Sequence, residues 1–179
     1  MANSDEKTAA AASREVYLLG EINAERMRQV GADVIRLYRE NPKAPIKLMF
    51  TSAGGDVDAS IAFCEVVEMK KIPLEAMVFF SADSAAIAII CSCRKRSATA
   101  SSTFLFHHIS KQAGGTRLTQ RDFELHAKDL AHSTAVYCKI IARATGRKPK
   151  EIAELMEKAV SLNAREAKKF GLIHKIIRV

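Results

Sequence analysis

LEAMVFFSADSAAIAIICSC (74–93) is the stretch that decides the fold, because it joins a strand pattern to a helix pattern through a short polar turn. Residues 74–80 are apolar except for Glu75, as in a buried strand, and Ser84 begins the apolar run of a buried helix over 84–92. The first N–H groups of a helix lack partners within it and favour negative charge. Ser84 is therefore placed as serine nucleophiles usually are, although a serine at such a junction also serves as a helix cap.

The same apolar run raises the alternative of a membrane span over 76–93. Ser81, Asp83 and Ser84 interrupt this run at its centre, where a charged group is costly in lipid. A strand followed by a buried helix accounts for the same apolar residues, and both elements then have ordinary lengths. We therefore expect no membrane association.

Two further stretches, TSAGGDV (51–57) and TFLFHH (103–108), also lie where predicted strands end. A glycine pair lets a backbone approach a substrate carbonyl closely, although such pairs are also common in plain turns. Because side chains alternate along a strand, only one of His107 and His108 can face Ser84. The three stretches together suggest an oxyanion-binding turn, a nucleophile turn and a base. Two adjacent histidines also suggest a metal site, but no third ligand follows at useful spacing, so we expect no metal or cofactor.

Strand and helix patterns alternate along the rest of the chain. We predict strands at 15–19, 46–50, 74–80, 103–108 and 172–179, and helices at 24–40, 57–70, 84–92, 119–144, 149–158 and 163–170. This order is typical of an α/β fold with a mostly parallel sheet covered by helices. In the second helix, the side chains expected to face the core are Ile61, Cys64, Val67 and Met69.

The length of 179 residues, with 48% hydrophobic content, predicts one domain over 14–179 after a disordered segment over 1–13. The four cysteines show no paired metal or redox spacing and no secretory signal pattern is present, so we expect reduced thiols in a cytoplasmic protein. The net charge of +8 is spread over helix faces without a nucleic-acid motif. A solvated basic surface is therefore favoured over nucleic-acid binding.

In order and spacing, the motifs of residues 14–178 resemble the proteolytic subunit of the Clp protease, a family of serine peptidases within the ClpP/crotonase fold. The nucleophile turn ADSAA (82–86) is similar to the family's ASMGA-type turn. Other similar segments are VYLLGEI (16–22), TSAGGDV, TFLFHH, the glycines Gly114 and Gly115, ELHAKDL (124–130), ATG (144–146) and NAREAKKFGLI (163–173). The resemblance implies a ClpP/crotonase-like α/β fold with a projecting handle helix.

Carried over residue by residue, the resemblance implies that Ser84 is the nucleophile and His107 the general base. The N–H groups of Gly55 and Ala85 would form the oxyanion hole. The implied substrates are peptides or unfolded polypeptide. The resemblance also implies a homo-oligomeric ring, which would bury the apolar positions of the long helix: Leu125, Leu130, Val136 and Ile140.

The position of the third triad residue departs from the family pattern. Counting on from Thr145 and Gly146 places Leu155 where the family has an aspartate. Glu154 and Glu157 lie about 100° or 200° around the predicted helix from that position. Losing the carboxylate typically lowers turnover on the order of ten-thousand-fold while leaving residual activity.

Two other departures bear on the site and on partners. Asp83 stands where the family has a small neutral residue, and its charge would either repel an oxyanion or accept the free N–H groups of the following helix. Lys47 and Met49 occupy strand positions where the family tends to carry tyrosines, and residues 1–14 lack the family's longer N-terminal arm. These differences put the docking of an ATPase unfoldase in doubt.

We therefore expect a Clp-like serine endopeptidase homologue that works through Ser84 and His107 with an incomplete triad. The first alternative is a catalytically inactive Clp-like ring subunit or scaffold, which Leu155 favours. The second is a crotonase-like acyl-CoA enzyme, because that fold also surrounds a thioester oxygen with two N–H groups.

Overall fold

The structure, a computed structural model, describes residues 13–110 and 119–178 of the chain. Residues 1–12 of the predicted N-terminal segment, and the pair Gly114 and Gly115, lie outside this range. The strands are β1 (Glu15–Leu19), β2 (Ile46–Ser52), β3 (Leu74–Ala82), β4 (Lys95–Thr99), β5 (Thr103–Leu105), β6 (Ser161–Asn163) and β7 (Lys175–Ile177). The helices are α1 (Ala24–Glu40), α2 (Val57–Met69), α3 (Ala85–Cys91), α4 (Gln120–Thr145), α5 (Pro149–Glu157) and α6 (Ala164–Phe170).

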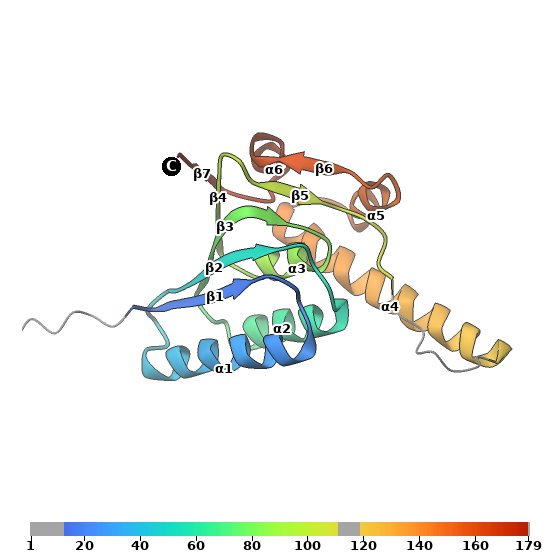
Figure 1. The fold of residues 1–179 in the computed structure, drawn as a ribbon, viewed down its shortest axis with the longest axis horizontal. Coiled ribbons are helices and arrows are strands. Elements are labelled where there is room, and N and C mark those ends of the chain that lie inside the picture. Colours follow the sequence, from blue (N-terminus) through green and yellow to red (C-terminus); the bar gives the residue numbers. More distant parts are fainter. Residues whose placement is uncertain (1–12, 111–118, 179) are drawn as a thin grey trace, which may run out of the picture.

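The central sheet runs in the order β1-β2-β3-β4-β7, and each neighbouring pair in it is parallel. β5 joins β3 through the parallel pair Ser81–Thr103 and pairs antiparallel with β6. The fold is therefore the mostly parallel α/β type that the alternation of elements predicts (Figure 1).

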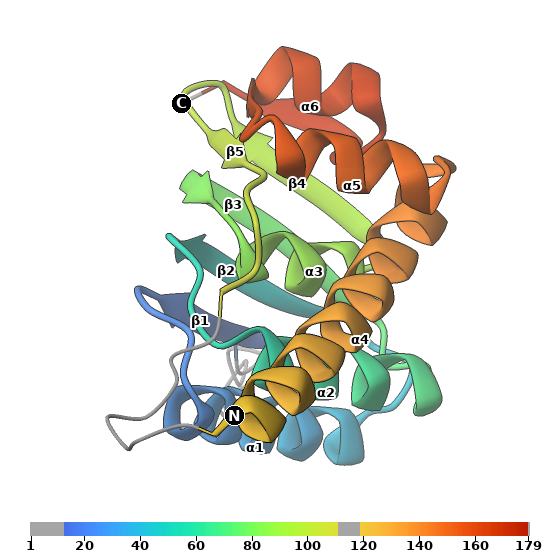
Figure 2. The same cartoon turned by 90° about the vertical axis from the view of Figure 1, so that its right-hand side faces the viewer.

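The two faces of the sheet differ in polarity because side chains alternate along each strand. One row across the register is fully buried and consists of Leu18, Phe50, Val78 and Ala98. The next row points to the other face and consists of Tyr17, Met49, Met77 and Ser97, of which Tyr17 is 56% exposed. Figures 1 and 2 show α1, α2 and α3 together on one side of the strands, with α4 crossing over α2 and α3.

Helix α4 is divided into a packed half and an open half. Its buried residues all lie between Ser133 and Ala142, whereas Phe123 and Leu125 are exposed. Figure 1 shows the N-terminal end of α4 reaching beyond the sheet, as expected for a projecting handle. The apolar positions predicted on this helix therefore differ in burial. Ile140 belongs to the core of this chain, whereas Leu125 is exposed to solvent.

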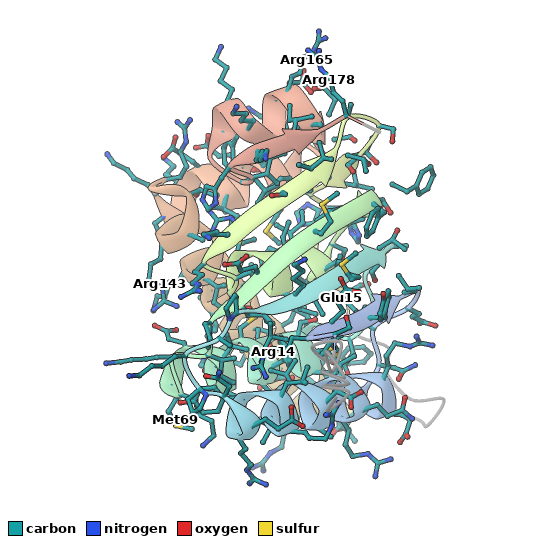
Figure 3. The ribbon with its side chains drawn as sticks, turned by 90° about the vertical axis from the view of Figure 1, so that its left-hand side faces the viewer. Arg14, Glu15, Met69, Arg143, Arg165 and Arg178 are labelled. Carbon is teal, nitrogen blue, oxygen red and sulfur yellow. The ribbon has the colours of Figure 1, made fainter. Side chains whose placement is uncertain are left out.

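Helix ends follow the local sequence. Asn23 caps α1 by accepting the N–H of Arg26, and Asn163 forms the predicted capping box with Glu166 at the start of α6. Just before β1 the guanidinium of Arg14, labelled in Figure 3, donates to four carbonyls in the last turn of α1 and after it, those of Leu37, Asn41, Ala44 and Pro45. These contacts hold the C-terminal end of α1 beside the start of β1.

The structure departs from the sequence prediction at short elements and element ends. The predicted strand over 103–108 ends at Leu105, so the histidines follow the strand. Met69 is the last residue of α2 and is 72% exposed, so its predicted inward position is wrong. The strand predicted over 172–179 is ordered as β7 for three residues only, and β6 has the same length and was not predicted. Three residues are too few to show a periodicity.

Arg96 joins the ends of several elements inside the fold. Its buried guanidinium donates to the carbonyl oxygens of Cys93, Ala144, Gly171 and Leu172 at 2.8–3.1 Å. Ala144 and Gly171 lie at the C-terminal ends of α4 and α6, where carbonyl groups lack helical partners and favour a cation. This side chain therefore holds together the C-terminal ends of α4 and α6 and the segment that follows α3.

Candidate active site

Ser84 lies in a strained turn between β3 and α3. Its backbone angles are φ 55 and ψ −127, a conformation that side chains other than glycine rarely adopt. Strain of this kind at a strand-to-helix turn is typical of serine nucleophiles, because it presents the hydroxyl outward. The hydroxyl does not cap α3 and makes no hydrogen bond to any residue in the described ranges, so the simple capping role does not explain the serine.

Three hydrogen bonds hold the main chain of this turn. The N–H of Ser84 donates to the Leu105 carbonyl at 2.8 Å, and its own carbonyl accepts from the N–H of Ile87 at 3.0 Å. The same carbonyl accepts from the hydroxyl of Tyr137 on α4 at 2.8 Å. Burial raises the pKa of Tyr137 well above its ordinary value, so the phenol remains a neutral donor. Sequence reasoning missed Tyr137, because its helical spacing marks it only as a core residue.

The glycine pair is required by packing against the serine turn and against Ile22, between β1 and α1. At Gly54, with φ 100, a Cβ would lie 2.7 Å from the Ser84 Cβ and 2.8 Å from the Asp83 carbonyl oxygen. At Gly55, with φ 138, a Cβ would lie 2.1 Å from the carbonyl oxygen of Ile22. Both glycines therefore serve a close backbone approach within the chain, in addition to any approach of substrate.

The two N–H groups predicted to form an oxyanion hole are without acceptors. In the described part of the chain, neither the N–H of Gly55 nor that of Ala85 is bonded, whereas the neighbouring N–H groups of Gly54 and Asp56 donate to Ser52 Oγ and the Ile22 carbonyl. A Cβ added at Gly54 would also lie 3.3 Å from the Ala85 nitrogen, so the two turns pack closely together. Unsatisfied main-chain donors in the glycine turn and in the serine turn are suited to binding a developing oxyanion.

His107 follows β5 and is partly exposed. Its Nδ1 atom lies 2.8 Å from the carbonyl oxygen of His108. A carbonyl only accepts, so Nδ1 carries the proton in this contact and Nε2 is left as an acceptor. The structure contains no hydrogen bond between the Ser84 hydroxyl and the His107 ring, both of which lie in the described ranges. Catalytic hydrogen bonds are often long or unformed without substrate.

The expected place of the triad acid is apolar. Leu155 on α5 is partly buried and packs against the hydrophobic core. Glu154 and Glu157, on the same helix, are exposed. Among the described residues, no carboxylate hydrogen-bonds the His107 ring. The His108 carbonyl therefore makes the contact at Nδ1 that a triad acid would make, without supplying a negative charge.

Asp83 does not cap α3, so the second of the two alternatives raised for its charge is wrong. Its Oδ1 atom instead accepts the main-chain N–H of Leu105 at 2.8 Å, in the strand that leads to His107. The N-cap position of α3 is held by Ser84, one residue later. The Asp83 side chain is directed to β5 and not to the helix. The sequence could not show this, because the partner is 22 residues away.

The described residues contain neither a cluster of metal-ligating side chains nor an exposed cysteine. Within 13–110 and 119–178, no group of three or more His, Cys, Asp or Glu side chains is arranged to hold a metal ion. The four cysteines are free and buried, and burial raises the pKa of Cys91 and Cys93 to about 12, which keeps them protonated. No helix in these ranges combines the length and apolar character needed to span a membrane.

The fold and the serine turn define a class, the α/β proteins with a ClpP-like sheet and a long crossing helix. A family model described as Clp protease matches residues 2–179, and the chain belongs to the Clp protease family. A relative is the ATP-dependent Clp protease proteolytic subunit 2 of Treponema denticola. It is 29% identical over 168 residues, which cover 93% of this chain and 82% of that protein.

Proposed function

We propose that this member of the Clp protease family is a serine endopeptidase that hydrolyses peptides or unfolded polypeptide through Ser84. The observation that carries the proposal is the strained backbone of Ser84, whose hydroxyl is unbonded and is followed in the chain by the unbonded N–H of Ala85. A serine that only caps a helix has no need of positive φ.

The proposed reaction uses four groups of this chain. Nε2 of His107 takes the hydroxyl proton as Ser84 Oγ attacks the peptide carbonyl, and the same proton then passes to the leaving amine. The N–H groups of Gly55 and Ala85 bind the oxyanion of the tetrahedral intermediate. Water then attacks the acyl-enzyme with His107 again as base, which releases the second product and restores Ser84.

The replacement of the triad acid by Leu155 makes this a slow enzyme. The His108 carbonyl selects the tautomer with a proton on Nδ1, which is the tautomer that a base at Nε2 requires. A neutral carbonyl cannot balance the imidazolium that forms when His107 accepts a proton. We therefore expect detectable acylation of Ser84 and turnover far below that of a complete triad.

The proposal is tested by labelling with a fluorophosphonate probe, read by intact mass. We expect one adduct on the purified protein, no adduct on Ser84→Ala, and an unchanged adduct on Ser101→Ala, an exposed serine in the turn between β4 and β5. No adduct at high probe excess on the unmodified protein would overturn the proposal.

A second candidate function is an inactive ring subunit or scaffold. It is favoured by Leu155, which packs into the core where the acid would stand, and by the missing hydrogen bond between Ser84 and His107. Under both functions we propose a homo-oligomeric ring in which a second copy covers the open half of α4, where Phe123 and Leu125 are exposed. A monomeric mass in solution would contradict the ring.

The proposed cellular setting and partners follow the same reasoning. Four free, buried thiols suit a reducing compartment, so we propose the cytoplasm. Lys47 and Met49 lie on the strand face opposite the buried row, and neither offers the aromatic ring expected for an ATPase pocket. We propose that the protein works on peptides or unfolded segments without such a partner, which co-sedimentation with an unfoldase of the Clp type would test.

A further inference from the structure

Two reciprocal hydrogen bonds join the serine turn to the segment that carries His107. The N–H of Ser84 donates to the carbonyl of Leu105 at 2.8 Å, and the N–H of Leu105 donates to Oδ1 of Asp83 at 2.8 Å. Leu105 is the last residue of β5 and stands two residues before His107. Figures 1 and 2 show β5 beside β3, the strand that ends at this turn.

A side chain is needed at this point because β3 has already ended. The ladder between β3 and β5 contains the pair Ser81–Thr103, after which the chain leaves the sheet for α3. Phe106 makes its main-chain bond to the other side of β5, where its N–H donates to the Val160 carbonyl at 2.8 Å. The N–H of Leu105 faces the serine turn, and the carboxylate of Asp83 takes the place of the missing strand.

The main chain of Asp83 binds the glycine turn on its other side. Its N–H donates to the carbonyl of Ser52 at 3.0 Å, and Ser52 Oγ accepts the N–H of Gly54 at 3.0 Å. Any residue except proline could donate this main-chain bond, whereas the bond to Leu105 needs a short side chain with an acceptor. Residue 83 therefore connects the oxyanion segment with the base segment, and only the second connection depends on aspartate.

We propose that Asp83 is a positioning residue, which holds β5 against the serine turn and thereby sets His107 relative to Ser84. The inference rests on the proposed function for its effect on chemistry. The role requires an acceptor oxygen at Oδ1 and no negative charge. Asparagine at this position keeps that oxygen and the size of the side chain, whereas alanine leaves the Leu105 N–H unsatisfied.

The test compares Asp83→Ala with Asp83→Asn on the full-length protein. Hydrogen exchange of the Leu105 amide, resolved by NMR, is expected to be roughly tenfold or more faster in Asp83→Ala, from the loss of one partly buried hydrogen bond. Labelling of Ser84 by the fluorophosphonate is expected to slow by roughly tenfold in the same variant. Asp83→Asn is expected to restore both rates to within about threefold of the unmodified protein, since the acceptor remains.

The two readouts separate this inference from the proposed function. If the unmodified protein is not labelled, the peptidase proposal fails, while the Leu105 amide still shows whether Asp83 holds β5. Equal exchange at Leu105 in all three proteins overturns the positioning role. Loss of labelling in Asp83→Asn as large as that in Asp83→Ala also overturns it, because the charge and not the acceptor would then be what the site uses.

Discussion

The serine turn and the end of α5 differ in how much of a hydrolytic site each provides. Around Ser84, main-chain bonds, a buried tyrosine and two glycines hold a strained serine turn, and the N–H groups of Gly55 and Ala85 are unbonded. At α5, the position of the acid is a leucine that packs into the core. The strained turn costs free energy to maintain and the leucine does not. Under the proposed function, the serine turn supplies the groups for attack and oxyanion binding, and α5 supplies no carboxylate to assist proton transfer.

The largest expected effect on labelling comes from disturbing the packing around the serine turn with a substitution at Gly55. In Gly55→Ala the new Cβ would clash with the Ile22 carbonyl oxygen, so the turn must move and the oxyanion donor with it. We expect fluorophosphonate labelling to fall on the order of a hundredfold or more. Urea denaturation should show a loss of about 2–3 kcal/mol in the free energy of unfolding.

Gly31→Ala is the matched control for that prediction. Gly31 lies inside α1, and a Cβ there would meet no atom within 4 Å. The free energy of unfolding should rise by about 0.5–1 kcal/mol, because alanine is the better helix former. A similar loss of labelling in both variants would mean that the glycine turn has no special part in the site.

A smaller effect, an increase in rate, is expected from placing a carboxylate at position 155 on α5. Leu155→Asp should speed labelling and peptide hydrolysis by roughly 10- to 100-fold, which is part of the factor that a triad aspartate supplies. It should also lower the free energy of unfolding by about 1–2 kcal/mol, because a partly buried apolar side chain is lost. Leu155→Asn is the matched control, because asparagine has nearly the shape of aspartate without its charge, and it should not gain activity. An unchanged rate in Leu155→Asp would show that α5 does not reach His107.

The smallest expected effect concerns the support of the serine turn by α4. Tyr137→Phe removes the hydroxyl that donates to the Ser84 carbonyl and should cost about 1 kcal/mol of stability, with a labelling rate about fivefold lower. Tyr17→Phe, on the exposed face of β1, should leave labelling within experimental error. Equal labelling of the two variants would show that the turn holds its strain without α4.

The long periodic elements could be predicted from the sequence, and the short ones could not. Helix α1 and strand β1 have the predicted bounds, because an amphipathic repeat and a cap act within one element. β6 is three residues long and exists only because it pairs with β5, and Met69 follows the predicted spacing but lies past the edge of the core. Pairing and core limits are set by distant segments, which a local pattern does not contain.

The same division applies to the candidate site. The sequence indicated the serine turn, the glycine pair and the empty acid position, because each is a local pattern or an alignment position. It did not indicate the bond from Tyr137 to Ser84 or that from Leu105 to Asp83, which join residues 53 and 22 positions apart. Whether Ser84 and His107 act as proposed stays a prediction.

The most direct test of the central claim compares labelling rates in His107→Ala and His108→Ala. His107 is proposed to activate Ser84 through its ring, whereas His108 contributes only a main-chain carbonyl, which alanine retains. The account predicts a loss on the order of a hundredfold or more in His107→Ala and a nearly unchanged rate in His108→Ala. Labelling of His107→Ala at the rate of the unmodified protein would contradict it.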